Sequence, residues 1–515
     1  MAQNPILIVG AGPTGLVLAL RLAAHGVSFR IIEKNSAPGL ASKAMVLHAR
    51  TLEFYDQLGF ADEIIRLGVK LETIHLRDTG REVAELNFNV MGKGLSPYPY
   101  MLCFPQDDHE KFLVSKLEQR GIKVEWNTTL VDFTQDDTGV HVVIDHEGKK
   151  ESFIASYICG CDGAHSRVRE VLGLGFAGGT YIHLHYVADV KLDGISATDG
   201  YVNVNAKGFA LALPVRSSGM TRLIGIMPDR PDSAPKATFE DVRQFSEPLL
   251  GVKVKEVNWF STYHVHHRVA EHFHKGRCFI LGDAAHIHSP TGGQGMNTGI
   301  GDAVNLSWKL AHVVQGRARP SLLDTFETER IAFARKLIST TDRAFNVIVS
   351  PNMDGRIFRG FIVPHIFPIL TKFSAMRRLI FKIVSQIQIV YRQSEISTGK
   401  AGAISAGDRL PWVPESALEN YHPLRSMNWQ VHVYGKAESN LQKTCDRLQI
   451  ELYVFPWGDL AEERKIPKDS TFLVRPDGYI ALASTASFTQ KLEAYAAEQK
   501  FEFGSSADYA PRTWA

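Results

Sequence analysis

Three glycines near the start of the chain have the spacing of a dinucleotide-binding turn. Gly10, Gly12 and Gly15 form the pattern G-x-G-x-x-G between a short apolar run, residues 6–9, and a helical pattern from Leu16. In such a turn the first glycine permits the bend, the second lets a pyrophosphate approach the backbone, and the third lets helix and strand pack closely. The helix N-terminus then offers unpaired N–H groups to phosphate oxygens. The sequence therefore predicts that this turn binds a nucleotide diphosphate.

An acidic residue follows this turn at the distance that nucleotide binding requires. A second strand, predicted for Phe29–Ile32, ends at Glu33, about 20 residues beyond the first glycine. A carboxylate at this position accepts hydrogen bonds from ribose hydroxyls. The order of strand, glycines, helix, second strand and acid favours a nucleotide site over a purely structural turn. On these residues alone the ligand could be NAD or FAD.

Two later segments have residues that could bind the rest of a flavin. Cys159–Arg169, CGCDGAHSRVR, follows an apolar stretch and precedes a helical pattern. Cys278–Leu310 is predicted to be a buried strand that ends at Gly282-Asp283, then a Gly/Pro loop, then a helix that begins near Gly295. Asp283 could bind a ribityl hydroxyl, or it could simply cap a helix. The helix N-terminus could stabilise the negative charge of a reduced flavin pyrimidine.

The three motifs, in this order and spacing, resemble those of the class A flavoprotein monooxygenases typified by para-hydroxybenzoate hydroxylase and phenol hydroxylase. The resemblance covers roughly residues 5–345. It implies a bound FAD, NADPH or NADH as reductant, and transfer of one oxygen atom from O2 to a phenolic or polyketide-type aromatic substrate through a flavin hydroperoxide. No second G-x-G-x-x-G follows a strand, which favours a hydroxylase over a reductase with two dinucleotide domains.

The resemblance also implies which residues contact the cofactor. The first motif would bind the ADP half of FAD, the Asp-Gly motif would serve both FAD and NAD(P)H, and the Gly-Asp motif would bind the ribityl chain. The loop 290–297 would lie beside the reactive ring. The segment 42–53 resembles a stretch that contacts flavin and pyrophosphate, with Lys43 where many relatives have arginine. The expected cofactor contacts are Gly10, Gly12, Pro13, Thr14, Gly15, Glu33, Lys43, Arg50, Gln106, Asp162, Gly163, Arg167, Gly282, Asp283, Pro290, Gly293, Gly295, Met296 and Asn297.

The region between the second and third motifs is predicted to form a mainly antiparallel sheet that roofs the substrate pocket. The predicted strands are His183–Val190, Gly200–Asn205, Gly208–Val215, Thr221–Met227 and Val252–Tyr263. Histidines on these strands could deprotonate a phenol, because histidine titrates near neutral pH. A half-exposed polar sheet face is the plainer explanation for them, and we assign no catalytic base. These candidates are His183, His185, His264, His266 and His267, with Arg268 beside them.

A basic, apolar segment and a separate C-terminal pattern complete the chain. Arg356–Gln393 is predicted to be a packed helical linker, or else an interfacial membrane helix, and Pro364 and Pro368 favour two short helices. Strands and helices then alternate from Trp429 onward and include a hairpin at Pro476-Asp477-Gly478. This pattern resembles the thioredoxin-like domain that ends phenol-hydroxylase-type members. With Cys445 and no CxxC pair, we expect a packing or dimerisation role instead of thiol redox chemistry.

These elements together predict an α/β fold. A Rossmann-like FAD-binding domain (1–180 and 275–345) would contain an inserted antiparallel-sheet substrate domain (181–274), followed by a helical linker (346–400) and a thioredoxin-like domain (401–515). The 515 residues carry a net charge of +2, which does not favour nucleic acid as a partner. Five cysteines without zinc-ligand spacing indicate no metal and a reduced, cytoplasmic location. No apolar run is long enough for a membrane span, and no signal peptide is expected.

Other uses of the same motifs stay open at the level of sequence. The flavin chemistry could serve epoxidation, oxidative decarboxylation or inactivation of a polycyclic compound. An FAD dehydrogenase that does not use O2 and a non-catalytic flavin protein are further alternatives. A halogenase is disfavoured, because the sequence has no W-x-W-x-I-P motif.

Overall fold

A parallel sheet carries the first glycine motif and determines where the other motifs lie. The computed structural model describes residues 4–39, 44–78, 80–205, 208–215, 219–228, 237–289, 291–349, 357, 361–362, 365–414 and 419–504. The sheet has the order β17-β18-β11-β1-β2, in which all neighbours are parallel except β17. Its strands are β1 (Ile6–Val9), β2 (Phe29–Ile32), β11 (Ile158–Gly160), β17 (His274–Lys275) and β18 (Cys278–Ile280). The three sequence motifs follow β1, β11 and β18, which are adjacent, so their loops meet at one edge of the sheet.

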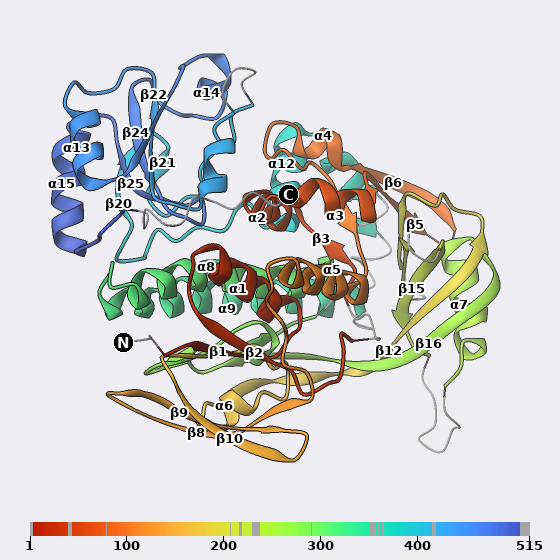
Figure 1. Ribbon diagram of the computed structural model, residues 1–515. Coiled ribbons are helices and arrows are strands. Elements are labelled where there is room, and N and C mark those ends of the chain that lie inside the picture. Colours follow the sequence, from red (N-terminus) through yellow and green to blue (C-terminus); the bar gives the residue numbers. More distant parts are fainter. Residues whose placement is uncertain are drawn as a thin grey trace.

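Helices cover one side of this sheet and a small antiparallel sheet covers the other (Figure 1). Helix α1 (Pro13–Ala24) packs against α5 (Gln106–Glu118) and α8 (Gly295–Val314), and α9 (Asp324–Val349) lies next to α8. The opposite layer is the meander β8 (Thr128–Asp136), β9 (Gly139–His146) and β10 (Lys149–Ala155). The apolar residues of β1 and of the inner face of α1 are fully buried between these layers, as their unbroken apolar patterns predict.

An eight-stranded sheet forms the second part of the fold, in the order β19-β16-β12-β15-β14-β13-β5-β6. The strands predicted between the second and third motifs are confirmed as β12 (Phe176–Asp193), β13 (Gly200–Asn205), β14 (Gly208–Val215), β15 (Met220–Ile226) and β16 (Lys253–Ala270). Strands β12 and β16 are much longer than predicted. The sheet also recruits β5 (Thr73–Asp78), β6 (Arg81–Asn87) and β19 (His286–Ile287) from outside residues 181–274.

One face of this sheet is covered by α7 (Glu240–Leu250), and we call the opposite face the inner face. On the inner face Leu211, Leu213 and Val215 pack in one apolar cluster with Met45 and Val46. The cluster also includes Phe381 of α12 (Ser374–Val384), and it joins this part of the sheet to the segment that precedes α2 (Ala49–Gln57). The inner face therefore looks toward the glycine-motif part of the fold.

The C-terminal unit, residues 398–504, forms a six-stranded sheet in the order β21-β20-β25-β24-β22-β23. Its main strands are β22 (Gln430–Tyr434), β23 (Glu451–Phe455), β24 (Ser470–Val474) and β25 (Ile480–Ser484), and its helices are α13 (Leu441–Leu448), α14 (Asp459–Glu463) and α15 (Phe488–Gln499). The hairpin predicted at Pro476-Asp477-Gly478 is confirmed: β24 and β25 pair antiparallel, and Gly478 takes a φ of +77°.

Two short helices precede this unit, as the prolines in the basic segment predict. They are α11 (Phe367–Leu370) and α12 (Ser374–Val384), whereas Pro364 lies outside the described residues. Helix α12 packs on α4 (Phe88–Gly92), where the rings of Phe381 and Phe88 lie 6.4 Å apart. Within the described ranges, we find no helix with the length and apolar character that a membrane crossing requires.

Candidate cofactor site

In the glycine turn after β1, Gly10 and Gly15 pack against the protein, whereas Gly12 borders open space. Gly10 has a φ of +104°, and a Cβ there would lie 2.4 Å from the carbonyl oxygen of Cys161. A Cβ on Gly15 would lie 2.0 Å from the carbonyl oxygen of Gly10, whereas a Cβ on Gly12 would meet no atom within 4 Å. The first and third glycines are therefore required by internal packing. The second borders free space, as close approach of a pyrophosphate needs.

The N-terminus of α1 points its unpaired amides at this space. Gly12 is the N-cap, Pro13 occupies the first helical position, no side chain caps the helix, and its first turn has no acidic residue. The positive end of the helix is thus left for an anion. The side chain of Thr14 fits against two other glycines, because a Cβ on Gly282 or on Gly299 would lie 2.6 Å or 2.4 Å from its Oγ1. Thr14 of the first motif therefore packs directly against Gly282 of the third motif.

Glu33 lies at the rim of the turn, where the sequence predicts the ribose contact. Its Oε2 accepts a hydrogen bond from the backbone N–H of Ala11 at 2.9 Å, and its Oε1 accepts one from the backbone N–H of Asn35 at 3.0 Å. The side chain is half-buried. Its carboxylate has lone pairs available for hydroxyl donors and is held in place by the turn itself.

Asp162 of the second motif has one bonded and one unbonded carboxylate oxygen. Its Oδ2 accepts hydrogen bonds from the backbone N–H groups of Arg167 at 2.7 Å and Val168 at 3.2 Å, at the start of α6 (Arg167–Val171). Its Oδ1 is buried without a hydrogen-bond partner among the described residues, and burial raises the pKa of this carboxyl. The next residue, Gly163, has a φ of +78° and faces open space. This loop is suited to a ligand with hydroxyl donors.

The two arginines of the second motif have different roles. Arg167, a predicted cofactor contact, donates through Nε and Nη2 to the carbonyl oxygen of Val131 at 3.1 and 3.0 Å, and pairs with Glu170. Arg169 donates to the carbonyl oxygens of Ala164 and Ala284, both at 2.8 Å. Arg169 thereby ties the second motif to the third, a contact that no local pattern in the sequence indicates.

The third motif is fixed by a buried carboxylate that sequence reasoning missed. Gly282 has a φ of +58°, and its backbone N–H donates to Oδ2 of Asp302 at 3.0 Å. The same oxygen lies 2.7 Å from Nε2 of His286, and Arg330 donates to Oδ1 at 2.6 Å. Burial would raise the pKa of Asp302, but Arg330 and His286 outweigh it and lower the pKa. Asp302 therefore holds the backbone of the turn on which Asp283 lies, and Asp283 is exposed.

The side chain of Asn297, a predicted cofactor contact, joins the start of α8 to residues 46–51. Its Oδ1 accepts the backbone N–H of His48 at 2.9 Å and the hydroxyl of Thr51 at 2.7 Å. Its Nδ2 donates to the carbonyl oxygens of Val46 at 2.8 Å and Gly293 at 2.9 Å. The buried carboxamide has two donor and two acceptor positions, and all are used inside the protein.

The N-terminus of α8 is a second uncapped helix end in the same region. Its N-cap residue, Gln294, makes no side-chain cap hydrogen bond, and the first turn, which includes Gly295 and Met296, contains no acidic residue. A helix of 20 residues has a developed dipole, so its first amides can stabilise a negative charge. Gly293, with a φ of +63°, turns the chain into this helix, and Pro290 lies outside the described residues.

Arg50 and Gln106, both predicted cofactor contacts, also hold chain segments together. Arg50 donates to Oε2 of Glu53 and to the carbonyl oxygen of Asp477, both at 2.7 Å. Gln106 accepts the backbone N–H of Ala44 at 3.3 Å and donates to Glu110 at 2.9 Å. Glu110 in turn accepts the backbone N–H of Gly39 at 2.9 Å. The pair thus supports both ends of the segment that contains Lys43, which lies outside the described residues.

The predicted histidines of the eight-stranded sheet differ in exposure and in their contacts. His185 is 1% exposed, lies beside Tyr263 with ring centroids 5.8 Å apart, and has a pKa that burial lowers to about 4. His264 is exposed, whereas Nδ1 of His266 lies 2.7 Å from the hydroxyl of Thr180. The inner face also carries a buried ion pair that sequence reasoning missed. There Arg222 donates through Nε and Nη2 to Asp189, directly opposite, at 2.7 and 2.8 Å.

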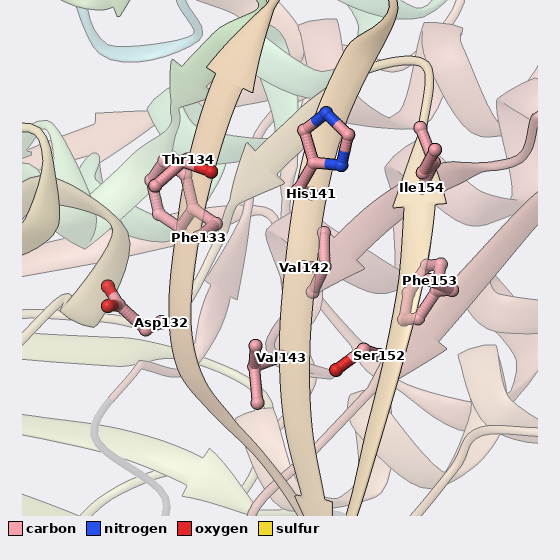
Figure 2. A pocket seen from close by; sticks show the side chains of 9 residues that line it. All are labelled: Asp132, Phe133, Thr134, His141, Val142, Val143, Ser152, Phe153 and Ile154. Carbon is pink, nitrogen blue, oxygen red and sulfur yellow. The ribbon is translucent and has the colours of Figure 1, made fainter.

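A shallow depression on β8–β10 lies apart from the three motifs (Figure 2). Its volume is about 340 Å³. Thr134, His141 and Ile154 form one cross-strand row in it, while Phe133 and its neighbours in register point into the core. None of the described residues of the three motifs lines it. We therefore place the candidate site at the motif loops, at the edge of the parallel sheet where β1, β11 and β18 end.

Known proteins resemble this chain in both sequence and fold. Residues 3–341 match the family described as an FAD binding domain. The chain is 32% identical to 6-methylpretetramide 4-monooxygenase of Streptomyces rimosus, over 96% of this chain and 93% of that protein. It is 33% identical to pentachlorophenol 4-monooxygenase of Sphingobium chlorophenolicum, over 68% and 65%. The structure of the anhydrotetracycline hydroxylase from Streptomyces rimosus matches with a TM-score of 0.77 and 25% identity, over 98% of this chain and 100% of that chain.

Proposed function

Because this chain belongs to the FAD-binding family of flavoprotein monooxygenases, we propose that it hydroxylates a phenolic or polyketide-type aromatic compound with electrons from NADPH or NADH. Flavin-dependent hydroxylation of aromatic substrates is the activity of the family. Bound FAD supplies the activation of O2, and the protein binds and orients the two reactants and excludes water.

The observation that carries the proposal is the open space over Gly12, faced by the uncapped N-terminus of α1. We propose that the pyrophosphate of FAD lies there, with Glu33 on the ribose and Asp283 on the ribityl chain. The N-terminus of α8 would face the pyrimidine end of the flavin. The unbonded Oδ1 of Asp162 would accept a hydrogen bond from the cofactor.

The substrate would lie between the flavin and the inner face of the eight-stranded sheet. That face is apolar at Leu211 and Leu213, and its buried charges, Asp189 and Arg222, neutralise each other. A pocket of this kind favours an uncharged aromatic ring system over a carboxylate, because Arg222 is already paired with Asp189. The names of the relatives include both a polyketide and a chlorinated phenol, so both classes belong in the test.

The experiment is a substrate panel with the purified holoenzyme. NADPH oxidation and O2 uptake are followed for simple phenols, benzoates and tricyclic or tetracyclic polyketides. We expect uncharged phenols or polyketides to accelerate both rates together and to give a product heavier by one oxygen atom. Acceleration by benzoates alone would contradict the substrate class. NADPH oxidation that continues at the same rate without O2 would favour the dehydrogenase alternative.

We further propose the domain division 1–180 with 275–345, 181–274, 346–400 and 401–515, with a thioredoxin-like C-terminal domain. What supports the last assignment is the order β22-α13-β23-α14-β24-β25-α15, with β23-β22-β24-β25 as neighbours and β22 parallel to β23. Burial raises the pKa of the Cys445 thiol to about 12, which favours a packing role over thiol chemistry.

Surface contact through the basic segment is a finer proposal about partners. Residues 356–393 contain seven Lys or Arg and no Asp or Glu. Phe373, Ile369 and Leu379 are 62%, 54% and 46% exposed there. Cations interspersed with apolar side chains fit an anionic lipid surface better than a symmetric homodimer, which would oppose like charges. Co-sedimentation with phosphatidylglycerol vesicles but not phosphatidylcholine vesicles is expected. No binding to either, with a dimer in sedimentation velocity, would favour the homodimer, and a monomer would indicate a packed linker.

A further inference from the structure

The turn of the C-terminal hairpin, residues 475–479, is buried against the helices of the motif region. Arg475, 0% exposed, donates through Nη1 and Nη2 to the two carboxylate oxygens of Glu329 on α9, at 2.7 and 2.9 Å. Its Nε and Nη2 also donate to Asp477 at 3.0 and 2.6 Å. A bidentate arginine–carboxylate pair of this kind fixes orientation as well as distance.

Glu329 accepts further hydrogen bonds from two other segments. Ser394 donates to its Oε1 at 2.6 Å, while Lys309 and Asn305 of α8 donate to its Oε2 at 2.9 and 2.6 Å. Burial would raise the pKa of Glu329, but Arg475 and Lys309 hold it well below the usual range. Arg475, Lys309, Glu329 and Asp477 thus form a neutral group of two cations and two anions.

The next residue on α9, Arg330, connects this group to the third motif. Arg330 donates to Asp302 at 2.6 Å, to the carbonyl oxygen of Thr298 at 3.0 Å and to the hydroxyl of Tyr391 at 2.9 Å. Asp302 in turn accepts the backbone N–H of Gly282 at 3.0 Å. Two adjacent residues of α9 therefore have different partners. Glu329 binds the C-terminal hairpin, and Arg330 binds Asp302, which holds the Gly-Asp loop.

The same hairpin also forms hydrogen bonds with side chains of α1, α2 and α8. Arg21 of α1 donates to the carbonyl oxygen of Pro476 at 3.3 Å. Arg50 of α2 donates to the carbonyl oxygen of Asp477 at 2.7 Å, and the indole of Trp308 on α8 donates to the Asp477 carboxylate at 3.2 Å. Helices α1, α2, α8 and α9 are all held by one buried turn.

We propose that Arg475 is a positioning residue for the cofactor site, acting through Glu329 and Arg330 of α9 and through Asp302 on the backbone of Gly282. The C-terminal unit is then part of the FAD site, although none of its residues needs to touch the cofactor. Removal of Arg475 leaves Glu329 with an excess of buried negative charge, so α9 must shift or recruit water to relieve it. The inference rests on the proposed binding of FAD at the Gly-Asp loop.

The test uses the full-length holoenzyme and the variants Arg475→Gln and Arg475→Lys. The control variant is Arg447→Ala, whose partner Glu493 lies on the surface of the same unit. FAD release on dilution, followed by flavin fluorescence, gives the dissociation constant, and visible circular dichroism reports the environment of the bound ring. We expect about tenfold weaker FAD binding for Arg475→Gln, which corresponds to about 1.4 kcal/mol. Arg475→Lys should recover part of it, and Arg447→Ala should behave as wild type.

A purely structural role would give a different pattern. If Arg475→Gln binds FAD as tightly as wild type and has the same flavin dichroism, the inference is overturned, whatever its melting temperature. Should Arg475→Gln fail to fold, Tyr391→Phe removes only the bond to Arg330, and it must weaken FAD binding and alter the dichroism. Tyr391→Phe with wild-type values would overturn the inference equally. Absence of FAD from the wild-type protein would instead refute the proposed function.

Discussion

The carboxamide of Asn297 holds the backbone N–H of His48, with 2.9 Å between the amide nitrogen and Oδ1. This bond joins the start of α8 to a segment 249 residues earlier in the chain. It places the loop before α8 and the segment 45–51 side by side, under the inner face of the eight-stranded sheet. This hydrogen bond therefore helps to fix the floor of the proposed substrate pocket.

Asn297→Ala is expected to lower the free energy of unfolding by about 3 kcal/mol, because it leaves several buried backbone groups without partners. Thr51→Val removes one of these four hydrogen bonds and should cost about 1 kcal/mol. Urea denaturation of both variants measures the difference. If both variants lose the same small amount of unfolding free energy, apolar packing alone holds the segment 45–51.

Glycines 12 and 15 should respond to alanine in opposite ways. Gly12→Ala places its methyl group in open space, so the apoprotein should keep its stability while FAD binding weakens by tenfold or more, on the order of 1.4 kcal/mol. Gly15→Ala drives a Cβ into the backbone of Gly10 and should destabilise the apoprotein by about 1–3 kcal/mol. Thermal unfolding without FAD and flavin titration separate the two effects. A Gly12→Ala protein with normal FAD affinity would mean that no phosphate lies at this turn.

Asp283→Ala is expected to purify largely free of FAD. The side chain is exposed, so the change in folding stability should stay within about 0.5 kcal/mol. Asp132→Ala, another exposed aspartate on the outer face of β8, is the matched control and should retain full flavin. The ratio of flavin to protein absorbance measures both. Full yellow occupancy in Asp283→Ala would disprove the ribityl assignment.

Two buried histidines beside the α8 loop make stability depend on pH. Burial lowers the pKa of His48 and of His288 from 6.5 to about 4. Both are neutral in the folded state, whereas the unfolded chain takes up protons below about pH 6.5. Stability is therefore fully present above pH 6.5 and is lost as pH falls toward 4, by about 1.4 kcal/mol per pH unit for each histidine.

Urea midpoints measured between about pH 7 and about pH 4.5 test this dependence. His288→Gln should remove its share of the slope and should be no more stable than wild type at neutral pH. A wild-type protein whose stability is flat across this range would contradict the assignment of two neutral buried imidazoles.

Local patterns were sufficient to predict the elements that carry the site. The glycine turn at Gly10–Gly15, the strand that ends at Gly282 and the hairpin at Pro476-Asp477-Gly478 each depend on residues close in sequence. Their backbone requirements, such as a positive φ, restrict the residue type directly. The same reasoning predicted five strands of the substrate sheet, but not β5 and β6, because pairing across the chain leaves no local signal.

The contacts that lock the site together could not be predicted in this way. Arg169 reaches Ala284, Asp302 holds Gly282 and Arg475 binds Glu329 across separations of 20 to 146 residues. Each of these side chains is unremarkable in its own segment, and only the fold gives it a partner. Arg50 lies in a segment that resembles a cofactor-binding stretch, and nothing in that segment indicates its hydrogen bond to the carbonyl oxygen of Asp477 in the C-terminal hairpin.

The central claim, that this chain is a flavin-dependent hydroxylase, is tested most directly with labelled oxygen. The purified protein is incubated with NADPH, an aromatic substrate from the panel and ¹⁸O2, and the product is analysed by mass spectrometry. We predict one ¹⁸O atom in each hydroxylated product and none when ¹⁸O-labelled water replaces labelled O2. Product oxygen that derives from water, or NADPH oxidation that yields no oxygenated product with any aromatic compound of the panel, would contradict the account.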